Sequence, residues 1–333
     1  MQSKPKLRYS TPVQQNSPEP SAIDKTETPP AAIPSKLNFV IILNQIVGIM
    51  LCCYAAAQIK SLWALILLAL VFGILMNSVY SIIHEAEHAM LFANRRTNDL
   101  WGAVMALFFP APFHLIRQGH LGHHFRNRSD DEAFDLYFEN DHRLWRSLVL
   151  YGILTGCYWI VVVLSNVVFL FFPFAADKKY WDFDRPSRAF MESLNPNYRR
   201  LIRLECLAVI GLHGLLIWGF HIPLLNYAVM YFGFGLTWSS MQYVHHYGTE
   251  RHVTRGARNL RLWEPVDRLW LNHNWHLVHH EHPTVPWVHL PHIGKVEQPG
   301  KRGFLLWSYV KMWRGPRKAK ERVENQYAGR IIR

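Results

Sequence analysis

The sequence predicts an all-α integral membrane protein with four transmembrane helices, further in-plane or re-entrant helices, and a histidine-rich, di-metal cap on the cytosolic side. Two observations support the membrane class. Of the 333 residues, 50% are hydrophobic and 18% are charged, below the quarter typical of soluble domains. The apolar residues also gather in runs of roughly 20, the length at which a helix crosses a hydrocarbon core of about 30 Å. A third observation, the 19 histidines, predicts the cap.

Composition divides the chain into three parts. Residues 1–36 contain seven prolines and many polar residues, which predicts a disordered cytosolic arm without the apolar core of a signal peptide. Residues 37–314 form the predicted membrane domain, and residues 315–333 a basic cytosolic tail. The formal net charge is +12, but the basic residues flank apolar runs, so they indicate membrane orientation and not nucleic-acid binding. The same charge can attract an acidic electron-transfer protein or anionic lipid headgroups.

Four apolar runs are predicted to cross the membrane as two helical hairpins. Residues 38–57 and 61–83 are separated by three residues and form the first hairpin. Residues 204–220 and 224–244 form the second, because the turn between them has no Lys or Arg, whereas the loop 173–203 carries seven and is expected in the cytosol. Both termini and all histidine clusters then face the cytoplasm.

Two other apolar segments are not predicted to cross. Residues 100–116 are interrupted by Pro110 and Pro112, which indicates an in-plane or re-entrant element. Residues 147–172 must enter and leave on one face, because a crossing there would separate the second and third histidine clusters. We expect this segment to bend near Ser165 and Asn166.

Three short histidine-rich boxes lie at 84–88, 120–124 and 276–280. Helical residues at i, i+3 and i+4 share a face, so each box can direct two or three imidazoles at one point. One HxxxH spacing is compatible with coincidence, but three such boxes beside apolar runs are not. Eight imidazoles are too many for one four-coordinate zinc and suit two metal ions. Nearby carboxylates can orient the rings through their second nitrogen; the candidates are Glu85, Glu87, Asp131, Asp135 and Glu281.

The three boxes (HEAEH, HLGHH and HLVHH) resemble those of the membrane fatty acid desaturase and hydroxylase superfamily. The stretch from Asn272 to His280, with Pro283, Pro286 and Trp287 behind it, is similar to the family's third box and the residues that follow it. The resemblance covers roughly residues 60–295. It implies a non-haem centre of two iron ions (Fe2+/Fe3+), with O2 as co-substrate and ligation by nitrogen alone. The ligands it implies are His84, His88, His120, His123, His124, His246, His276, His279 and His280.

The ninth ligand comes from the end of the last predicted span. Residues 242–248 resemble the family's Asn-x-x-x-His, which makes His246 the ligand in preference to its neighbour His245. Gln242 stands where the family has the Asn, so its supporting role is a departure. His273, three residues before the third box, is a further candidate for a ligand or a supporting residue, and Glu85 and Asp131 are expected behind the ligands.

The resemblance implies O2-dependent oxidation of a C–H bond in a fatty acyl chain. Desaturation is the first choice; hydroxylation and oxidative decarboxylation of a free fatty acid to a terminal alkene are alternatives. Arg117, Arg126 and Arg128 can hold a carboxylate or phosphate of the substrate, or contact lipid headgroups. The chain has neither a His-Pro-Gly-Gly haem motif nor a cysteine cluster, so we expect a separate ferredoxin, rubredoxin or cytochrome with its reductase.

Two other classes compete. The first box also fits H-E-x-x-H, the zinc motif of metalloproteases, with Glu85 as general base. That interpretation leaves the six histidines of the other boxes unexplained. A metal transporter would place its ligands near mid-bilayer, whereas these boxes lie at span ends and beyond.

Overall fold

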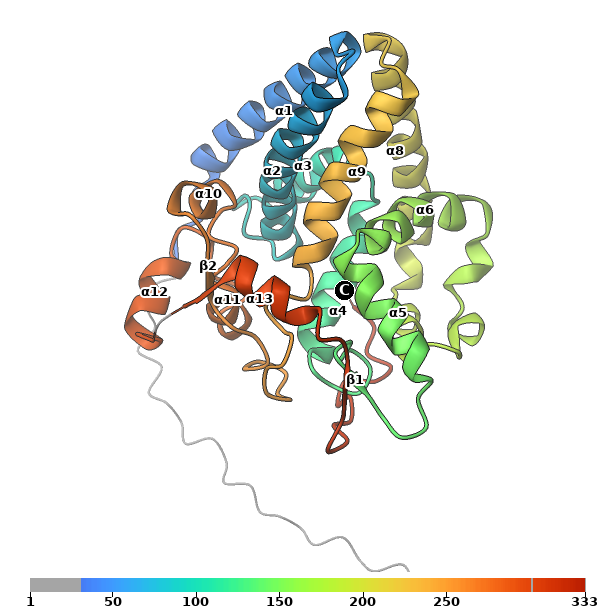
Figure 1. Ribbon diagram of the computed structural model, residues 1–333, viewed down its shortest axis with the longest axis vertical. Coiled ribbons are helices and arrows are strands. Elements are labelled where there is room, and N and C mark those ends of the chain that lie inside the picture. Colours follow the sequence, from blue (N-terminus) through green and yellow to red (C-terminus); the bar gives the residue numbers. More distant parts are fainter. Residues whose placement is uncertain (1–30, 301, 333) are drawn as a thin grey trace, which may run out of the picture. The chain divides into compact units, whose positions relative to one another are not determined.

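The computed structural model describes residues 31–300 and 302–332, and the regular secondary structure of this part of the chain is almost all helical (Figure 1). The all-α class is therefore confirmed. The four strands have two residues each and form two parallel pairs, β1 (Leu136–Tyr137) with β4 (Arg317–Lys318) and β2 (Leu260–Arg261) with β3 (Gly303–Phe304). Most of the predicted disordered arm lies outside the described residues.

Four long helices form two hairpins whose turns lie at the same end of the described structure (Figure 1). The first hairpin is α1 (Ser35–Gln58) with α2 (Leu62–Glu87), and the second is α8 (Arg199–Phe220) with α9 (Leu224–Met241). The Asn226 side-chain amide joins the two turns, because it donates to the carbonyls of Ala56 and Ile59 at 2.8 and 2.9 Å.

Not all four long helices have the length and composition of a membrane span. Three helices, Ser35–Gln58, Leu62–Glu87 and Pro196–Phe220, are long and apolar enough to cross a membrane. The fourth predicted span, α9, has 18 residues and is not among them. Two bent helix pairs raise the possible total to five.

The pair α2 and α9 forms the centre of the described structure. At Gly233 of α9 the helices approach so closely that a Cβ atom would lie 2.7 Å from the Cβ of Ala69. One turn further along α9 and two turns further along α2, Asn77 donates to the Thr237 hydroxyl at 3.1 Å. Phe72, Met76 and Phe234 are fully buried beside this contact.

The first bent pair consists of α3 (Arg95–Phe108) and α4 (Phe113–Arg126), which meet at 102°. The break contains Pro110 and Pro112, so the interruption predicted from these prolines is present. Pro112 precedes the first residue of α4, where a missing N–H costs little. The bend gives the second histidine box a helix of its own.

The second bent pair consists of α5 (Arg143–Leu154) and α6 (Cys157–Phe171), at 89°. The prediction of a bend near Ser165 and Asn166 is wrong, since α6 continues through both residues. Their side chains bond to the carbonyls of Val162 and Pro110 and leave the helix intact. The chain turns instead at Gly156, whose φ of +93° favours glycine and whose added Cβ would lie 3.2 Å from Leu236 Cα.

The remaining helices are short and surround the ends of α2, α4 and α9. They are η1 (Pro173–Ala176), η2 (Lys178–Trp181), α7 (Arg185–Ser193), η3 (Pro196–Tyr198), α10 (Glu264–Leu269), α11 (His276–Glu281), α12 (Leu290–Glu297) and α13 (Leu305–Met312). The segment after α13 folds back along the loop that follows α4. Val323 N donates to Asp130 at 2.9 Å, and Ile332 N donates to the Ser193 carbonyl at 3.0 Å.

The α2–α9 contact yields a stability prediction. Replacing Gly233 with Ala should lower the free energy of unfolding by about 1–3 kcal/mol, because the added methyl group must push the two helices apart. Thermal unfolding of the purified protein in detergent would measure the effect. The matched control is Gly214→Ala in α8, where a Cβ meets nothing within 4 Å. Equal melting temperatures for the two variants would contradict the predicted close packing.

Candidate metal centre

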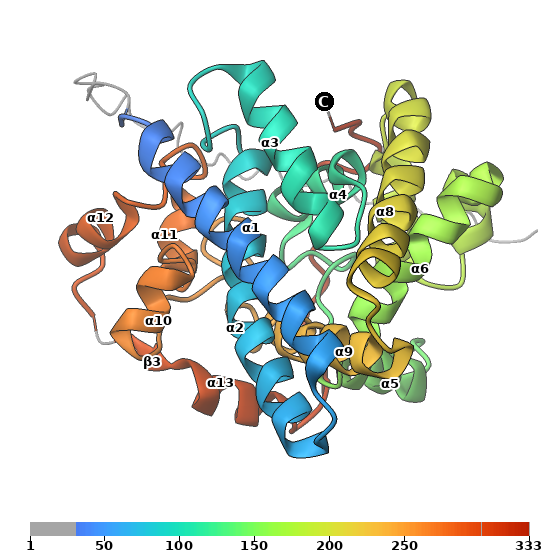
Figure 2. The ribbon, with the colours of Figure 1, turned by 90° about the horizontal axis from the view of Figure 1, so that it is seen from above.

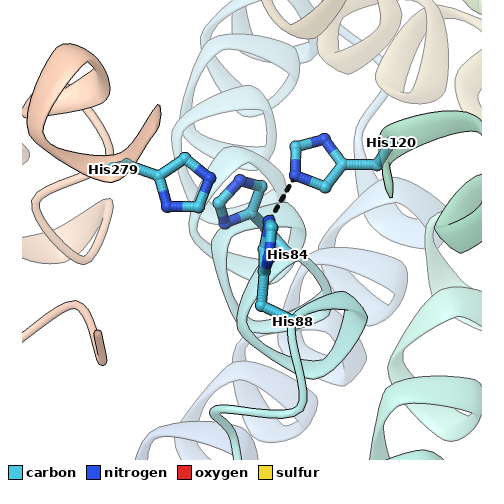
Figure 3. Close-up of side chains that lie close together, drawn as sticks. All are labelled: His84, His88, His120 and His279. Carbon is cyan, nitrogen blue, oxygen red and sulfur yellow. Dashed lines mark hydrogen bonds between the residues drawn. The ribbon is translucent and has the colours of Figure 1, made fainter. Parts of the chain in front are cut away.

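The boxes converge at the ends of α2, α4 and α9 opposite the hairpin turns. Four histidines form one group, whose potential ligand nitrogens all lie within 4.8 Å of one another: His84, His88, His120 and His279. Figure 3 shows these four rings directed toward one another from three separate segments. A second group meets the same criterion: His123, His246, His276 and His280.

Local helix geometry places the rings as their spacing predicts. His84 lies in the last turn of α2 and His88 caps it. The second box lies on the last turns of α4, and the third box occupies α11, a helix of six residues. His246 lies in the turn that follows α9.

His124 belongs to neither group of four and lies between them. Its Nε2 atom is 3.2 Å from Nε2 of His120 and 3.0 Å from Nε2 of His279. Its ring is also 4.3 Å, centroid to centroid, from that of His280 in the second group. All nine predicted ligands are therefore adjacent in space.

The spacing of the nitrogens fits metal binding. Five pairs of Nε2 atoms from different histidines lie 2.7 to 3.3 Å apart. Two nitrogens bound to one ion at about 2.1 Å would be separated by roughly 3.0 to 3.4 Å at right or tetrahedral angles. His84 Nε2 is moreover buried without a hydrogen-bond partner among the described residues. A buried polar atom in that state requires a partner, and a metal ion would supply one.

The protonation states also suit metal ligands. Burial lowers the pKa of His246, His276, His279 and His280 well below its usual value of 6.5, and repulsion from neighbouring rings lowers it further. These imidazoles are therefore neutral at pH 7. Neutral imidazole offers the lone pair that iron, zinc and copper bind.

Comparison with known proteins assigns the chain. The fatty acid desaturase family model matches residues 61–313. The chain belongs to the fatty acid desaturase family. The resemblance predicted from the three boxes is thus confirmed. A chloroplastic omega-3 fatty acid desaturase from Glycine max is 25% identical over 297 residues, which cover 84% of this chain and 59% of the relative. The chain thus spans about three-fifths of that relative's length.

One carboxylate in this desaturase-family chain contacts the ring of a predicted ligand. Glu132 contacts His123 Nδ1 at 2.6 Å and accepts a bond from Arg126 Nε at 3.1 Å. Although burial alone would raise it, His123 and Arg126 hold the pKa of Glu132 below its usual range, so it is an anion. The sequence analysis named the neighbouring Asp131, which instead accepts a bond from Asn325 at 3.0 Å. Spacing alone could not separate the two acids, because both lie in an irregular loop.

His246 and His245 have different environments. His246 Nδ1 contacts the Gly256 carbonyl at 2.8 Å, and its Nε2 lies 3.0 Å from His276 Nε2. His245 Nε2 instead lies 3.1 Å from the Asn274 side chain. The structure therefore places His246, and not His245, in the second group.

Three other residues predicted to support the ligands, namely Glu85, Gln242 and His273, each have a different contact. Glu85 accepts a bond from Trp287 N at 3.1 Å and lies 3.9 Å from His84 Nδ1. Gln242 donates to the carbonyl of Trp238 in its own helix at 3.2 Å. The ring of His273 lies edge-on to that of His84, with 4.8 Å between centroids.

The remaining carboxylate candidates do not contact a ligand ring among the described hydrogen bonds. Glu281 pairs with Gln298, and Asp135 pairs with Arg128. Both carboxylate oxygens of Glu87 are buried without a hydrogen-bond partner in the described part of the chain.

Each arginine proposed for the substrate headgroup is buried with an internal partner. Arg117 pairs with Asp99 at 3.4 Å, Arg126 with Glu132, and Arg128 with Asp135. Asp135 also accepts bonds from the Tyr243 hydroxyl and Gly248 N, both at 2.7 Å. The Arg128–Asp135 pair therefore holds the turn that carries His246.

The contact of Glu132 with His123 predicts a selective effect on metal binding. Glu132→Gln should weaken iron binding by about 10- to 100-fold, because the ring loses the anion that orients it and increases its basicity. Iron retained during a chelator titration would measure the loss. Asp131→Asn is the matched control, since its carboxylate contacts Asn325 and not a ring. A larger loss in the control than in Glu132→Gln would contradict the assignment.

The lowered pKa values predict acid sensitivity of the metal-free protein. Below about pH 6.5 these histidines become protonated in the unfolded chain but stay neutral in the folded protein, where burial lowers their pKa. The free energy of unfolding should therefore fall as pH drops, by up to about 1.4 kcal/mol per pH unit for each such ring. Melting temperatures of chelator-treated protein between pH 7.5 and 5 would test this. A flat profile would show that the rings are not buried in neutral form.

Proposed function

We propose that this member of the fatty acid desaturase family is a membrane-bound, O2-dependent di-iron oxidoreductase that desaturates a fatty acyl chain. The supporting observation is the pair of largely buried histidine groups, five of whose eight members are buried and three half-buried, at the ends of apolar helices. In this proposal the nine histidines hold two iron ions (Fe2+/Fe3+). When bound, the iron would supply the O2-activating redox chemistry.

The chain's own residues have distinguishable roles in this proposal. Glu132 and the Gly256 carbonyl orient His123 and His246 through their second nitrogens. An aromatic wall lies beside His84, formed by Tyr80, Phe109 and Trp238, whose ring centroids are 4.9 to 5.4 Å apart. Such a wall excludes water and suits an unreactive methylene chain next to the metals.

The proposed topology has four spans, with both termini and the metal centre on the cytosolic side. Exposed Trp63 and Trp218, which are 79% and 74% accessible, lie near the two hairpin turns and suit the opposite interface. Roughly 20 helical residues from Leu62 cover a hydrocarbon core of about 30 Å, which brings His84 to the cytosolic interface. We further propose a lipid or fatty acyl substrate and a separate ferredoxin, rubredoxin or cytochrome with its reductase as electron source.

The alternatives receive less support from the described contacts. Decarboxylation of a free fatty acid needs a cation near the metals, and Arg117 is buried against Asp99. A zinc protease would use Glu85 as its base, but this carboxylate accepts a bond from Trp287 N. It would also leave the second histidine group without a role. Hydroxylation uses the same site, so only the product distinguishes it.

Product analysis tests the proposal directly. Membranes supplied with O2, an electron source and candidate lipids should yield an internal double bond, detected by mass. An alcohol as the product would identify the reaction as hydroxylation, and a shortened terminal alkene would identify it as decarboxylation. Bound zinc with none of these products would overturn the proposed chemistry.

Two substitutions separate the oxidoreductase from a protease. His279→Ala should lower product formation by more than about 100-fold, because a ligand in the first histidine group is lost. Glu85→Gln should retain measurable turnover, since an amide oxygen can still accept the bond from Trp287 N. Loss of function in Glu85→Gln with full function in His279→Ala would favour the protease.

A further inference from the structure

An open cleft of about 470 Å³ lies outside the metal centre, between the loop 249–259 and the segment that contains β3 and α13. The loop contributes Arg255, Arg258 and Asn259, and the other wall contributes Phe304, Trp307 and Lys311. One wall is thus mainly polar and cationic, while the other carries two aromatic side chains. The cleft therefore offers a cationic surface and an aromatic surface side by side, which suits a ligand with an anionic head and an apolar tail.

Positive charge in the cleft exceeds the negative charge available to balance it. Arg255 is paired with Glu250, which also lines the cleft, at 3.1 Å. Neither Arg258 nor Lys311 has a carboxylate partner among residues 31–300 and 302–332. The Nε atom of Arg258 is buried without a hydrogen-bond partner in that part of the chain. The Nη2 atom of Arg258 donates to the Tyr247 carbonyl. Arg258 and Lys311 therefore carry charge that no carboxylate of the described residues neutralises, and this charge can attract an anionic group.

The helix α13 adds an apolar surface next to these charges. Its buried face packs, through Leu305 and Met312, in the same cluster as Leu154 and Tyr243. Its other face leaves four large apolar side chains 46% to 57% accessible, namely Leu306, Trp307, Val310 and Trp313. Figure 2 shows α13 outside the bundle of long helices.

We propose that the cleft and the exposed face of α13, together, bind an anionic phospholipid. The phosphate lies between Arg258 and Lys311, and the acyl chains lie along Trp307 and Val310. Guanidinium and ammonium groups bind phosphate through charge-assisted hydrogen bonds. Tryptophan rings on an amphipathic helix suit the boundary between headgroups and acyl chains. The proposal depends on membrane placement and not on the reaction, so it stands or fails independently of the proposed desaturase activity.

The bound lipid would contact a loop that supports the metal centre. Thr249, which lines the cleft, donates to the His246 carbonyl at 2.7 Å and to the Gly256 carbonyl at 3.0 Å. Gly256 in turn holds the His246 ring. A lipid in the cleft would thus contact the loop whose backbone carbonyl at Gly256 holds His246 of the second histidine group.

Lipid titration of the full chain in detergent, followed by native mass spectrometry, tests the proposal. Phosphatidylglycerol should bind more tightly than phosphatidylcholine of the same chain length. Lys311→Gln should weaken phosphatidylglycerol binding by about fivefold, the effect of one cation near an anionic headgroup. Trp307→Gln should weaken it severalfold as well, through the acyl-chain contact. Lys295→Gln, which removes an exposed lysine of α12, is the control and should bind as the parent protein does.

Several outcomes would overturn the proposal. Equal binding of the two lipids, or an unchanged affinity in Lys311→Gln, would show that the cleft does not recognise the anionic headgroup. If glycerol 3-phosphate competed as well as the whole lipid, α13 would have no part in binding. If phosphatidylglycerol did not bind and a reduced acidic [2Fe–2S] ferredoxin bound in a Lys311-dependent manner, the cleft would be a protein-docking surface. Size-exclusion profiles and iron content of each variant would verify that the fold is retained.

Discussion

The structure depends on bringing nine imidazoles together at the ends of apolar helices, five of them buried and four partly buried. In the proposed metal site each ring presents one nitrogen to a metal ion, and the surrounding protein can hold the other nitrogen in place. His123 uses a buried carboxylate and His246 a backbone carbonyl for this purpose. Burial lowers the pKa of His246 and His276 and so preserves their lone pairs. The same burial makes the site costly to assemble without metal, because unsatisfied polar atoms such as His84 Nε2 remain inside the protein.

The helical scaffold meets this requirement by fixing three separate segments against one another. Close packing at Gly233 and Ala69 sets the distance between α2, which carries the first box, and α9, which leads to His246. The break at Pro110–Pro112 turns α4 so that the second box faces the first. The third box lies on a helix of only six residues, too short to be stable alone, so its position depends on contacts. Asn259 provides two of them, because its side-chain oxygen accepts bonds from the backbone of Leu277 and Val278.

Charged residues around the centre form an internal support and not an open binding surface. Arg126 and Arg128 each neutralise a buried carboxylate, Glu132 and Asp135, and those carboxylates hold the second box and the turn after α9. Removing one partner of such a pair would leave a buried charge without compensation, which is strongly destabilising. Arg258 and Lys311, the latter in α13, have by contrast no carboxylate partner among the described residues.

The sequence by itself determined the helical class, the apolar runs and the eight box histidines, because these follow from local periodicity of 3.6 residues per turn and from composition. It also located the break at Pro110 and Pro112, since proline acts on its own backbone. Only the tertiary structure decided features that depend on contacts between distant segments. The second bend falls at Gly156 because Leu236 approaches its backbone there, and the polar Ser165 and Asn166 remain inside a continuous helix. Glu132 orients His123 while Asp131 contacts Asn325, because partners distant in sequence set the directions of residues in a loop. For the same reason, no pattern in the sequence could show that Arg117 and Arg126 are buried in ion pairs.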